Sequence, residues 1–231
     1  MEKLRHLVIK HKVDILNLTE LNTNWSKVQN KETIWRCINK WREQGHTNAS
    51  HNKKESTPTV QQYGGTAVSL FNKAAIRKHA TGTDPRSLGR WSWTRIRGKA
   101  DTVTVIISAY CPCVSYGPHS VYSQHLREMQ EITLPPTVNN PRKFFWHDLS
   151  EFIKEQTQQG FRIILTGDFN SEHTHVTEWM LEHGLVDRIC ENMDMNMPHV
   201  LTQNPKIPPL MEYTVLHFFL FDKEGTCLSI N

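Results

Sequence analysis

Residues 161–170 read FRIILTGDFN, an apolar run that stops abruptly at Gly-Asp-Phe-Asn. The apolar part predicts a buried β-strand, and Asp168 and Asn170 follow at its end. Because side chains alternate between the two faces of an extended segment, these two residues point to one side and Phe169 points to the other. The sequence therefore predicts a carboxylate and an amide at one spot, at the end of a rigid element.

Two other predicted strands end in the same way. The stretch VDILNL at 13–18 runs into Thr19 and Glu20, and TVTVIISAY at 102–110 ends at Tyr110. Proteins with α/β folds present reactive groups at strand ends, because the strand is rigid and the residues that follow face solvent. Taken singly, each residue also has an ordinary structural role, since an acid can cap a helix and an Asn can form a turn. As a group they form a candidate site.

Four segments carry apolar residues at helical spacing. The second of them is expected to end at Gly45. The third begins with Asn140-Pro141, a typical helix start, and ends at Gly160. The predicted helices cover residues 1–12, 30–45, 140–160 and 175–183.

Two more strands are predicted at YGGTAVSLF (63–71) and WSWTRIR (91–97), which are rich in β-branched and aromatic residues. The second of them is expected to form a hairpin with 102–110 through a turn at 98–101. Hairpins are thus mixed with helix-strand units, which a simple parallel sheet would not give. We predict an α/β (α+β) fold, a four-layered α/β/β/α sandwich of two mixed β-sheets flanked by helices.

Two long segments are predicted to be loops. Residues 46–62 are polar without periodicity, and Gly82, Pro85 and Gly89 indicate loops through most of 73–90. With 231 residues the chain is long enough to bury a substantial core, and we expect a single domain over its whole length.

The charge distribution is uneven. Residues 1–100 contain 19 Lys and Arg against 7 Asp and Glu, a net +12, whereas 101–231 contain 8 against 16, a net −8. A basic half beside an acidic half fits a protein that binds a polyanion on one surface and a cation on another, although solvated surface charge gives the same totals.

A basic stretch inside the first half alternates with aromatic residues. We predict that Arg90, Arg95 and Arg97, which are interleaved with Trp91 and Trp93, contact the phosphates of a nucleic acid. An alternative is that both tryptophans simply face the core, because they alternate in one strand.

Cysteine content and hydropathy exclude several other classes of protein. The five cysteines form an odd set, and Cys111-Pro-Cys113 is the only close pair, so neither a disulfide framework nor a zinc site is indicated. No stretch has the eighteen or so consecutive apolar residues of a membrane span, and the charged start MEKLRHLVIKHK is unlike a signal peptide. We expect a soluble, non-secreted protein with no membrane contact, and no protein partner is indicated.

Four stretches in order along the chain, ILNLTELN, YGGTAVSLF, VIISAYCPC and LTGDFNSE, resemble motifs of the endonuclease/exonuclease/phosphatase family. These are its metal-binding Glu, glycine-led strand, Tyr-x-Pro and Gly-Asp-Phe-Asn motifs, found in DNase I-like and AP-endonuclease-like enzymes. The likeness covers about residues 1–190 and leaves 191–231 divergent. Within the family, LGRWSWTRIRGK followed by SAYCPC looks most like endonuclease domains carried by retroelements.

The resemblance implies a DNase I-like fold that hydrolyses phosphodiesters of DNA with Mg²⁺ or Mn²⁺. By this resemblance Glu20 holds the metal, Asp168 takes the proton from the attacking water, Asn170 orients the water and the phosphate, and Tyr110 donates to a phosphoryl oxygen. Such a site suits Mg²⁺, which prefers carboxylate oxygens and keeps several of its waters.

The sequence departs from the family pattern near both of its ends. The family opens with a strand that ends in a metal-supporting Asn and closes with Asp-Tyr and Ser-Asp-His motifs. Here the first motif is missing, Glu212-Tyr213 is the nearest counterpart to Asp-Tyr and a degenerate site, and no Ser-Asp-His follows. We therefore expect a chain truncated at both ends relative to the family and impaired in activity, since one transition-state donor is typically worth about 10²- to 10³-fold in rate.

Two other functions stay open on the sequence alone. The first is a catalytically inactive remnant that at most binds nucleic acid through its basic half. The second is a phosphatase that acts on a small phosphoester, because fold alone does not fix the substrate.

Overall fold

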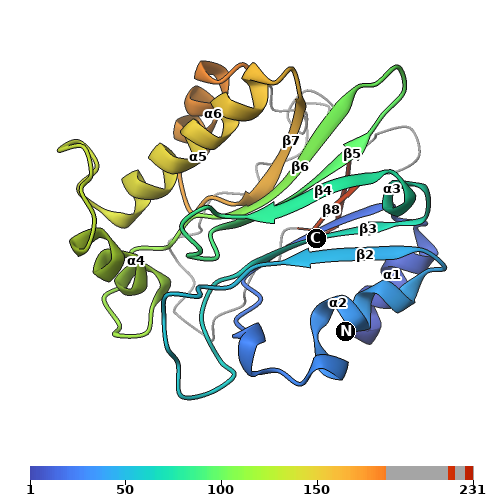
Figure 1. Cartoon of the computed structure of the whole chain (residues 1–231), viewed down its shortest axis with the longest axis horizontal. Helices are drawn as coiled ribbons and strands as arrows, with labels where there is room; N and C mark the ends of the chain where they lie inside the picture. Colours follow the sequence, from blue (N-terminus) through green and yellow to red (C-terminus); the bar gives the residue numbers. More distant parts are fainter. Residues whose placement is uncertain (186–217, 222–226, 231) are drawn as a thin grey trace, which may run out of the picture.

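The computed structural model describes residues 1–185 and two short strands at 218–221 and 227–230. The predicted degenerate site at Glu212 lies outside the described residues. Within them, two β-sheets pack face to face and helices cover both outer faces (Figure 1). The predicted α/β sandwich of two sheets flanked by helices is confirmed.

The first sheet has the strand order β2-β3-β1-β8-β9, and each of its described pairings is antiparallel. Strand β8 lies next to β1, with Leu220 opposite Leu16. The strands are β1 (Ile15–Thr19), β2 (Gly45–Ala49), β3 (Thr66–Phe71), β8 (Phe218–Phe221) and β9 (Cys227–Ile230).

The second sheet has the order β4-β5-β6-β7. Its first three strands are antiparallel neighbours, and β7 is parallel to β6, with Tyr110 opposite Asp168. The predicted hairpin is therefore confirmed as β5-β6. The strands are β4 (Lys78–Thr83), β5 (Trp91–Arg97), β6 (Val103–Tyr110) and β7 (Arg162–Asp168).

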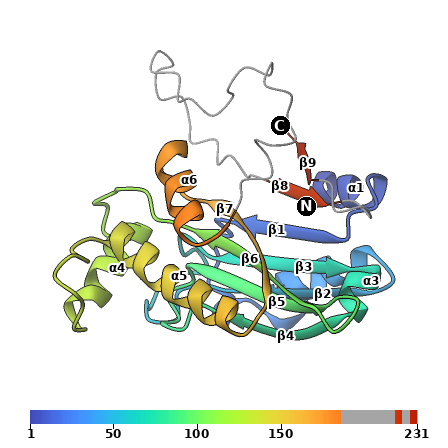
Figure 2. The same ribbon diagram turned by 90° about the horizontal axis from the view of Figure 1, so that it is seen from above.

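The helices form the outer layers, and in the view from above α5 lies in front of the second sheet (Figure 2). Helices α1 and α2 pack on the first sheet around Phe71, and α5 and α6 pack on the second around Trp91. None of the described helices could span a membrane. The helices are α1 (Glu2–Lys10), α2 (Ile34–Ile38), α3 (Asn72–Ile76), α4 (Val121–Gln130), α5 (Pro141–Gln158) and α6 (His173–Glu182).

Helix α5 illustrates why its sequence forms a helix at this place. The Asn140 side chain accepts from the backbone N–H groups of Arg142 and Lys143, and Pro141 occupies the first turn, where its missing N–H costs nothing. Its apolar stripe, which includes Leu149 and Phe152, is buried against Trp91 and the rest of the second sheet. The predicted start and stripe of this helix are confirmed.

Three predictions for the first half of the chain are wrong. The helix predicted over 30–45 is broken into α2 and two 3-10 turns, Asn30–Glu32 and Asn39–Trp41. The loop predicted over 46–62 contains most of β2, and the loop predicted over 73–90 contains most of α3 and all of β4.

Tertiary contacts explain why β2 forms a strand despite its polar sequence. Thr47 donates through Oγ1 to Ser69 Oγ of β3 (3.0 Å), and Asn48 donates to the carbonyls of Gly82 (2.7 Å) and Trp93 (3.1 Å) in the other sheet. These partners lie more than twenty residues away along the chain, so local composition does not indicate them.

Polar side chains join the two sheets across their interface. Thr66 Oγ1 donates to Ser92 Oγ (3.1 Å), and Ser108 Oγ donates to the carbonyl of Leu18 (2.9 Å). Asn17 Nδ2 donates to Thr166 Oγ1 at 2.6 Å. All three bonds are buried, where a lost partner costs about 1–3 kcal/mol, so they fix the relative placement of the sheets more strictly than apolar contact would.

The stability of the fold should depend on the protonation of His125, which is fully buried in α4. Burial, followed by the charge of Arg90, lowers the pKa of His125 to about 3. An unfolded histidine binds its proton near pH 6.5, so on acidification the unfolded state is protonated first and stability is lost.

We expect the free energy of unfolding to fall by about 2 kcal/mol between pH 7 and pH 5 through this group alone. Urea titrations at the two pH values measure the loss. It should be smaller in His125→Gln and unchanged in the control His79→Gln, whose side chain is exposed on β4. An equal loss in all three proteins would contradict the assignment.

Candidate active site

The C-terminal ends of β1, β6 and β7 meet at one place in the described structure. Tyr110 and Asp168 are register partners, and the N–H of Cys111 donates to the carbonyl of Asp168 at 2.8 Å. The bonds Ser108–Leu18 and Asn17–Thr166 tie β1 to the same two strands two or three residues earlier. Three of the predicted site residues are thus presented by adjacent, mutually fixed strand ends.

Glu20 ends β1 in a left-handed backbone conformation, with φ of 52°. This conformation is uncommon for residues other than Gly and Asn, and such strain tends to occur where a side chain must be directed. The hydroxyl of Tyr110 donates to the Glu20 carboxylate. Glu20 and Tyr110, which are ninety residues apart, therefore meet in one site.

Tyr110 stays protonated in this environment. Its side chain is 5% exposed, and burial followed by its hydrogen bond to Glu20 raises the pKa of Tyr110 far above its usual range. The phenol is therefore a permanent hydrogen-bond donor at neutral and moderately alkaline pH.

The loop after β7 fixes the Asn170 amide. Asn170 has a φ of 45°, and its backbone N–H donates to Asp168 Oδ1 at 3.0 Å. Its Nδ2 donates to the carbonyl of Cys111 (2.8 Å), and its Oδ1 accepts from Cys113 Sγ (2.8 Å). One Nδ2 hydrogen remains for another acceptor.

Phe169 points away from this pair and into the protein, as the alternation of side chains predicts. Its ring stacks on Trp146 with a centroid distance of 5.4 Å and an interplanar angle of 23°. Contact with the core around α5 thus anchors the turn between Asp168 and Asn170.

Glycines allow the backbones to come this close. A Cβ on Gly167 would lie 1.9 Å from the carbonyl oxygen of Ala109, an overlap that no relaxation of a side chain could relieve. On the other side, Leu21 N–H donates to the carbonyl of Gly65 (3.2 Å) and Asn22 N–H to that of Gly64 (2.8 Å). The chain after Glu20 is therefore fixed against the glycine pair.

Sequence reasoning missed the cation beside the site. Arg142, in the first turn of α5, donates through Nη2 to Ser171 Oγ (2.5 Å), one residue beyond Asn170. Its charge also acts on Cys111, whose pKa burial raises to about 12 despite this nearby cation. The sequence offered one signal for Arg142. It is a basic residue in the first turn of the predicted helix that directly precedes the Gly-Asp-Phe-Asn strand.

The prediction that Arg90 contacts phosphate is wrong. Arg90 is 1% exposed, and its guanidinium binds both carboxylate oxygens of Asp84 (2.7 and 2.8 Å) and Asp148 Oδ2 (2.8 Å). Burial alone would raise the pKa of Asp84, but the charge and hydrogen bonds of Arg90 lower it. A guanidinium enclosed in this way is saturated with partners and cannot reach a ligand.

Arg95 and Arg97 are not brought to the candidate site. Arg97 pairs with Val103 at the far end of β5-β6, about six residues or 20 Å from the end where Trp91 pairs with Ala109. Arg95 lies over the rings of Trp93 and Phe161 and donates to Gln156 Oε1 (2.6 Å).

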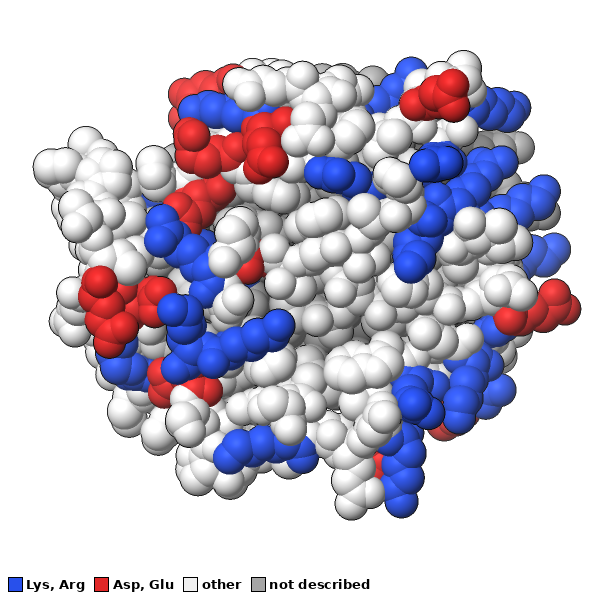
Figure 3. Space-filling model, in the orientation of Figure 1, with Lys and Arg blue, Asp and Glu red and all other residues white. Residues whose placement is uncertain are grey.

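Several basic side chains of the first half lie at this far end instead. In Figure 3 Lys and Arg cover the side of the molecule over the β5-β6 turn and α3. The exposed basic residues of these segments are Lys73, Arg77, Lys78, Arg97 and Lys99. A phosphate contact at Arg95 or Arg97 remains a prediction, but it would lie away from Asp168.

The donor set fits a hard cation. In the described part of the chain, no three His, Cys, Asp or Glu side chains cluster closely enough to enclose a metal. Glu20 and Asp168 nevertheless offer half-buried carboxylates, and Mg²⁺ needs only one or two of these because it keeps waters and binds substrate phosphates. A zinc ion, which takes three or four protein ligands, would not fit.

Comparison with known proteins identifies the family. The sequence profile of the Endonuclease/Exonuclease/phosphatase family matches residues 1–187. The chain belongs to this family. Enzymes of this family generally use a divalent metal. A comparison with curated proteins found no match.

Two solved structures are similar to the chain. An AP endonuclease from Archaeoglobus fulgidus is 14% identical, with a TM-score of 0.43 over 73% of this chain and 51% of its own. A truncated TDP2 from Caenorhabditis elegans is 15% identical, with a TM-score of 0.42 over 75% of this chain and 55% of its own. The chain thus spans about half the length of these two proteins.

The buried ion cluster generates a stability prediction. Arg90→Met should lower the free energy of unfolding by roughly 3–5 kcal/mol, because it leaves the carboxylates of Asp84 and Asp148 without their buried partner. Arg97→Met, an exposed change on the same strand, should alter it by less than about 0.5 kcal/mol. Denaturant titration of both variants measures these changes. Losses of unfolding free energy of similar size in Arg90→Met and Arg97→Met would mean that the ion cluster does not stabilise the fold.

Proposed function

We propose that the chain is a Mg²⁺-dependent phosphodiester hydrolase that cuts DNA at the site formed by Glu20, Tyr110, Asp168 and Asn170. The observation that carries the proposal is the hydrogen bond between Tyr110 and Glu20 beside the Asp168-Asn170 turn. It supports a single site that contains a metal-binding acid, a second acid, an amide and a neutral hydroxyl donor.

Glu20 is the proposed metal ligand. The Tyr110 hydroxyl orients its carboxylate, and the fixed backbone after it limits its movement. When bound, Mg²⁺ would supply positive charge against the phosphate oxygens as negative charge develops. Mn²⁺ would be accepted by the same oxygen ligands.

Asp168 is the proposed general base. One of its carboxylate oxygens accepts the Asn170 N–H, which orients the group, and the carboxylate would take the proton of the attacking water. The water oxygen would then attack phosphorus while the bond from phosphorus to the leaving oxygen breaks. The remaining Nδ2 hydrogen of Asn170 would orient the water or a phosphate oxygen.

Tyr110 and Arg142 are the proposed phosphate-binding groups. Tyr110 would shift its donated hydrogen bond from Glu20 to a phosphoryl oxygen, and the raised pKa keeps its proton available for this. Arg142 is only partly buried and lies next to Asn170 through Ser171, so its remaining N–H groups can bind a phosphate of the same strand.

DNA is favoured over a small phosphoester by the basic first hundred residues and by the likeness of LGRWSWTRIRGK and SAYCPC to retroelement endonuclease domains. A small phosphoester needs no extended basic surface. The charge distribution gives equal support to a protein that binds DNA without cutting it.

Cleavage tests the proposal directly. Wild-type protein should nick supercoiled plasmid in Mg²⁺, and Asp168→Asn should slow nicking by about 10²- to 10⁴-fold, the usual contribution of a general base. Asp101→Asn, an exposed acid in the β5-β6 turn, is the matched control and should cut at the wild-type rate.

Three results would overturn the proposal. Equal nicking by wild type and Asp168→Asn would point to a contaminating nuclease. Salt-sensitive DNA binding without cleavage in Mg²⁺ or Mn²⁺ would leave a binding protein. Hydrolysis of a small phosphoester without nicking would identify a phosphatase.

Metal binding provides a second test. Glu20→Gln should weaken Mn²⁺ binding, measured by electron paramagnetic resonance on the DNA-free protein, by at least roughly 10-fold, because it removes the anionic oxygen of the proposed ligand. Glu172→Gln, an exposed acid that follows the Asp168 loop, should bind Mn²⁺ as the wild type does. Equal affinities of the two variants would exclude Glu20 as the ligand.

A further inference from the structure

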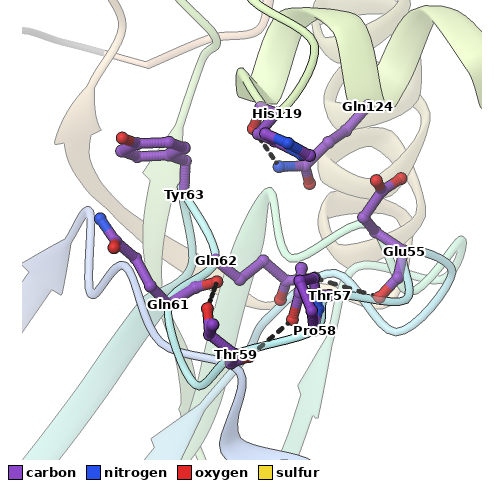
Figure 4. Close-up of a pocket in the computed structure, with 9 residues that line it drawn as sticks. All are labelled: Glu55, Thr57, Pro58, Thr59, Gln61, Gln62, Tyr63, His119 and Gln124. Carbon is purple, nitrogen blue, oxygen red and sulfur yellow. Dashed lines mark hydrogen bonds between the residues drawn. The ribbon is translucent and has the colours of Figure 1, made fainter.

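A pocket lies near the candidate site. It has a volume of about 210 Å³ and lies between the loop that precedes β3 and the start of α4 (Figure 4). This volume is below the roughly 300 Å³ at which complete small-molecule sites begin, so it suits one part of a larger ligand. The lining residues are Glu55, Thr57, Pro58, Thr59, Gln61, Gln62, Tyr63, His119 and Gln124.

Backbone contacts join this pocket to Glu20. Thr23 forms a β-bridge with Gln61, and Gln62 N–H donates to the carbonyl of Asn22 at 3.2 Å. Tyr63 directly precedes the glycine pair that fixes the chain after Glu20. At about 3.3 Å per residue and 4.8 Å between strands, the backbone of Tyr63 lies on the order of 10 Å from that of Glu20.

A network of buried amides makes the pocket floor rigid. Asn52 Nδ2 donates to Gln124 Oε1 (2.9 Å), and Gln124 Nε2 donates to the carbonyl of His119 (2.8 Å). Gln62 Nε2 donates to the carbonyl of Asn52 (2.9 Å). Gln62 Oε1 is buried and has no hydrogen-bond partner among the described residues, so this lining residue carries an unsatisfied acceptor.

The lining chemistry argues against phosphate as the occupant. No Lys or Arg is among the described residues that line the pocket, and its one acid, Glu55, is paired with Arg127 at 2.8 Å. What remains is neutral and polar, with amide and hydroxyl groups. Such a surface suits an uncharged group that carries hydrogen-bond donors and acceptors on its edge.

Two planar side chains flank the pocket on one side. Figure 4 shows Tyr63 and His119 on the side opposite to residues 57–59. Tyr63 is 46% exposed and His119 is also exposed, so both residues are accessible to a ligand. Unstacked nucleobases bind to protein in this way, with the ring stacked on an aromatic side chain and the edge hydrogen-bonded.

We infer that this pocket binds one unstacked nucleobase of the DNA strand whose phosphate lies at Glu20, with Tyr63 as the stacking side chain. The inference rests on the proposed function, because it assigns to the cut strand the pocket next to the metal ligand. It adds a contact that reads a base, whereas the groups around Asp168 contact only phosphate.

DNA binding in metal-free buffer tests this inference apart from cleavage. Tyr63→Ala should weaken binding of a DNA duplex by roughly 5- to 150-fold, which corresponds to about 1–3 kcal/mol for one stacked base. Tyr63→Phe should keep most of the affinity because it keeps the ring. The matched control is Tyr116→Ala, since Tyr116 is 78% exposed and does not line the pocket; it should bind within about twofold of wild type.

Duplexes with a single abasic analogue, moved through every position, identify the base. At one position, loss of the base should weaken binding by wild type but not by Tyr63→Ala, since the partner is already absent. The salt dependence should be the same in Tyr63→Ala as in wild type, whereas Arg142→Gln should reduce its slope by about one phosphate contact.

The outcomes separate this inference from the proposed function. Equal affinity of Tyr63→Ala and Tyr116→Ala, no position-specific coupling, or no DNA binding at all would overturn the base pocket. If plasmid is still nicked in an Asp168-dependent way, the nuclease proposal survives that result. Coupling at one position without any nicking would support the pocket and overturn the nuclease.

Discussion

The buried guanidinium of Arg90 is the constraint on which the arrangement around the candidate site depends. An unpaired cation in the interior costs several kcal/mol, and the two carboxylates that neutralise this one come from separate elements, Asp84 before β5 and Asp148 in α5. Pairing therefore ties α5 to the start of β5. The carbonyl of Arg90 accepts the N–H of Tyr110 (2.7 Å), and the first turn of the same helix carries Arg142. Neutralisation of one internal charge thus helps to position both Tyr110 and Arg142 near Asp168.

Polar contacts between the sheets fix the position of β1, as the ion pairs of Arg90 fix the position of α5. Apolar side chains such as Ile15 and Ile106 fill most of the interface, and they would tolerate a shift of one sheet over the other. The hydrogen bond between Asn17 and Thr166 is directional and buried, so a shift would leave both groups unsatisfied. Asn17 lies three residues before Glu20 and Thr166 two before Asp168. Specificity of sheet packing and convergence of the two acids therefore have the same cause.

The difference between local sequence patterns and contacts with distant residues explains which features the sequence could predict. The strand ends at Glu20, Tyr110 and Asp168 follow local rules, since each is an apolar run that stops at a polar residue. The start of α5 follows local capping rules in the same way. Other features depend on distant partners: Arg90 alternates with tryptophans like a surface cation, and its burial follows from Asp148, 58 residues later. Strand β2 has no apolar alternation, and its pairing with β3 determines its conformation. The contact of Arg142 with Ser171 likewise depends on the docking of α5, although the place of Arg142 in the first turn of that helix can be read from the sequence.

Charge is separated along the molecule, and this bears on the size of the substrate. The proposed phosphate-binding groups lie at one end of the β5-β6 hairpin, and the exposed basic residues around Arg97 and Lys99 lie at the other, about 20 Å away. The pocket near Glu20 has no Lys or Arg among its described lining residues, and its one acid, Glu55, is paired with Arg127. A small phosphoester could use the first group of residues but would leave the other two without a role. A duplex rises about 3.4 Å per base pair, so roughly six base pairs would span that distance. Only an extended polyanion with bases could use all three surfaces at once, which is the physical reason behind the proposal that the substrate is a nucleic acid.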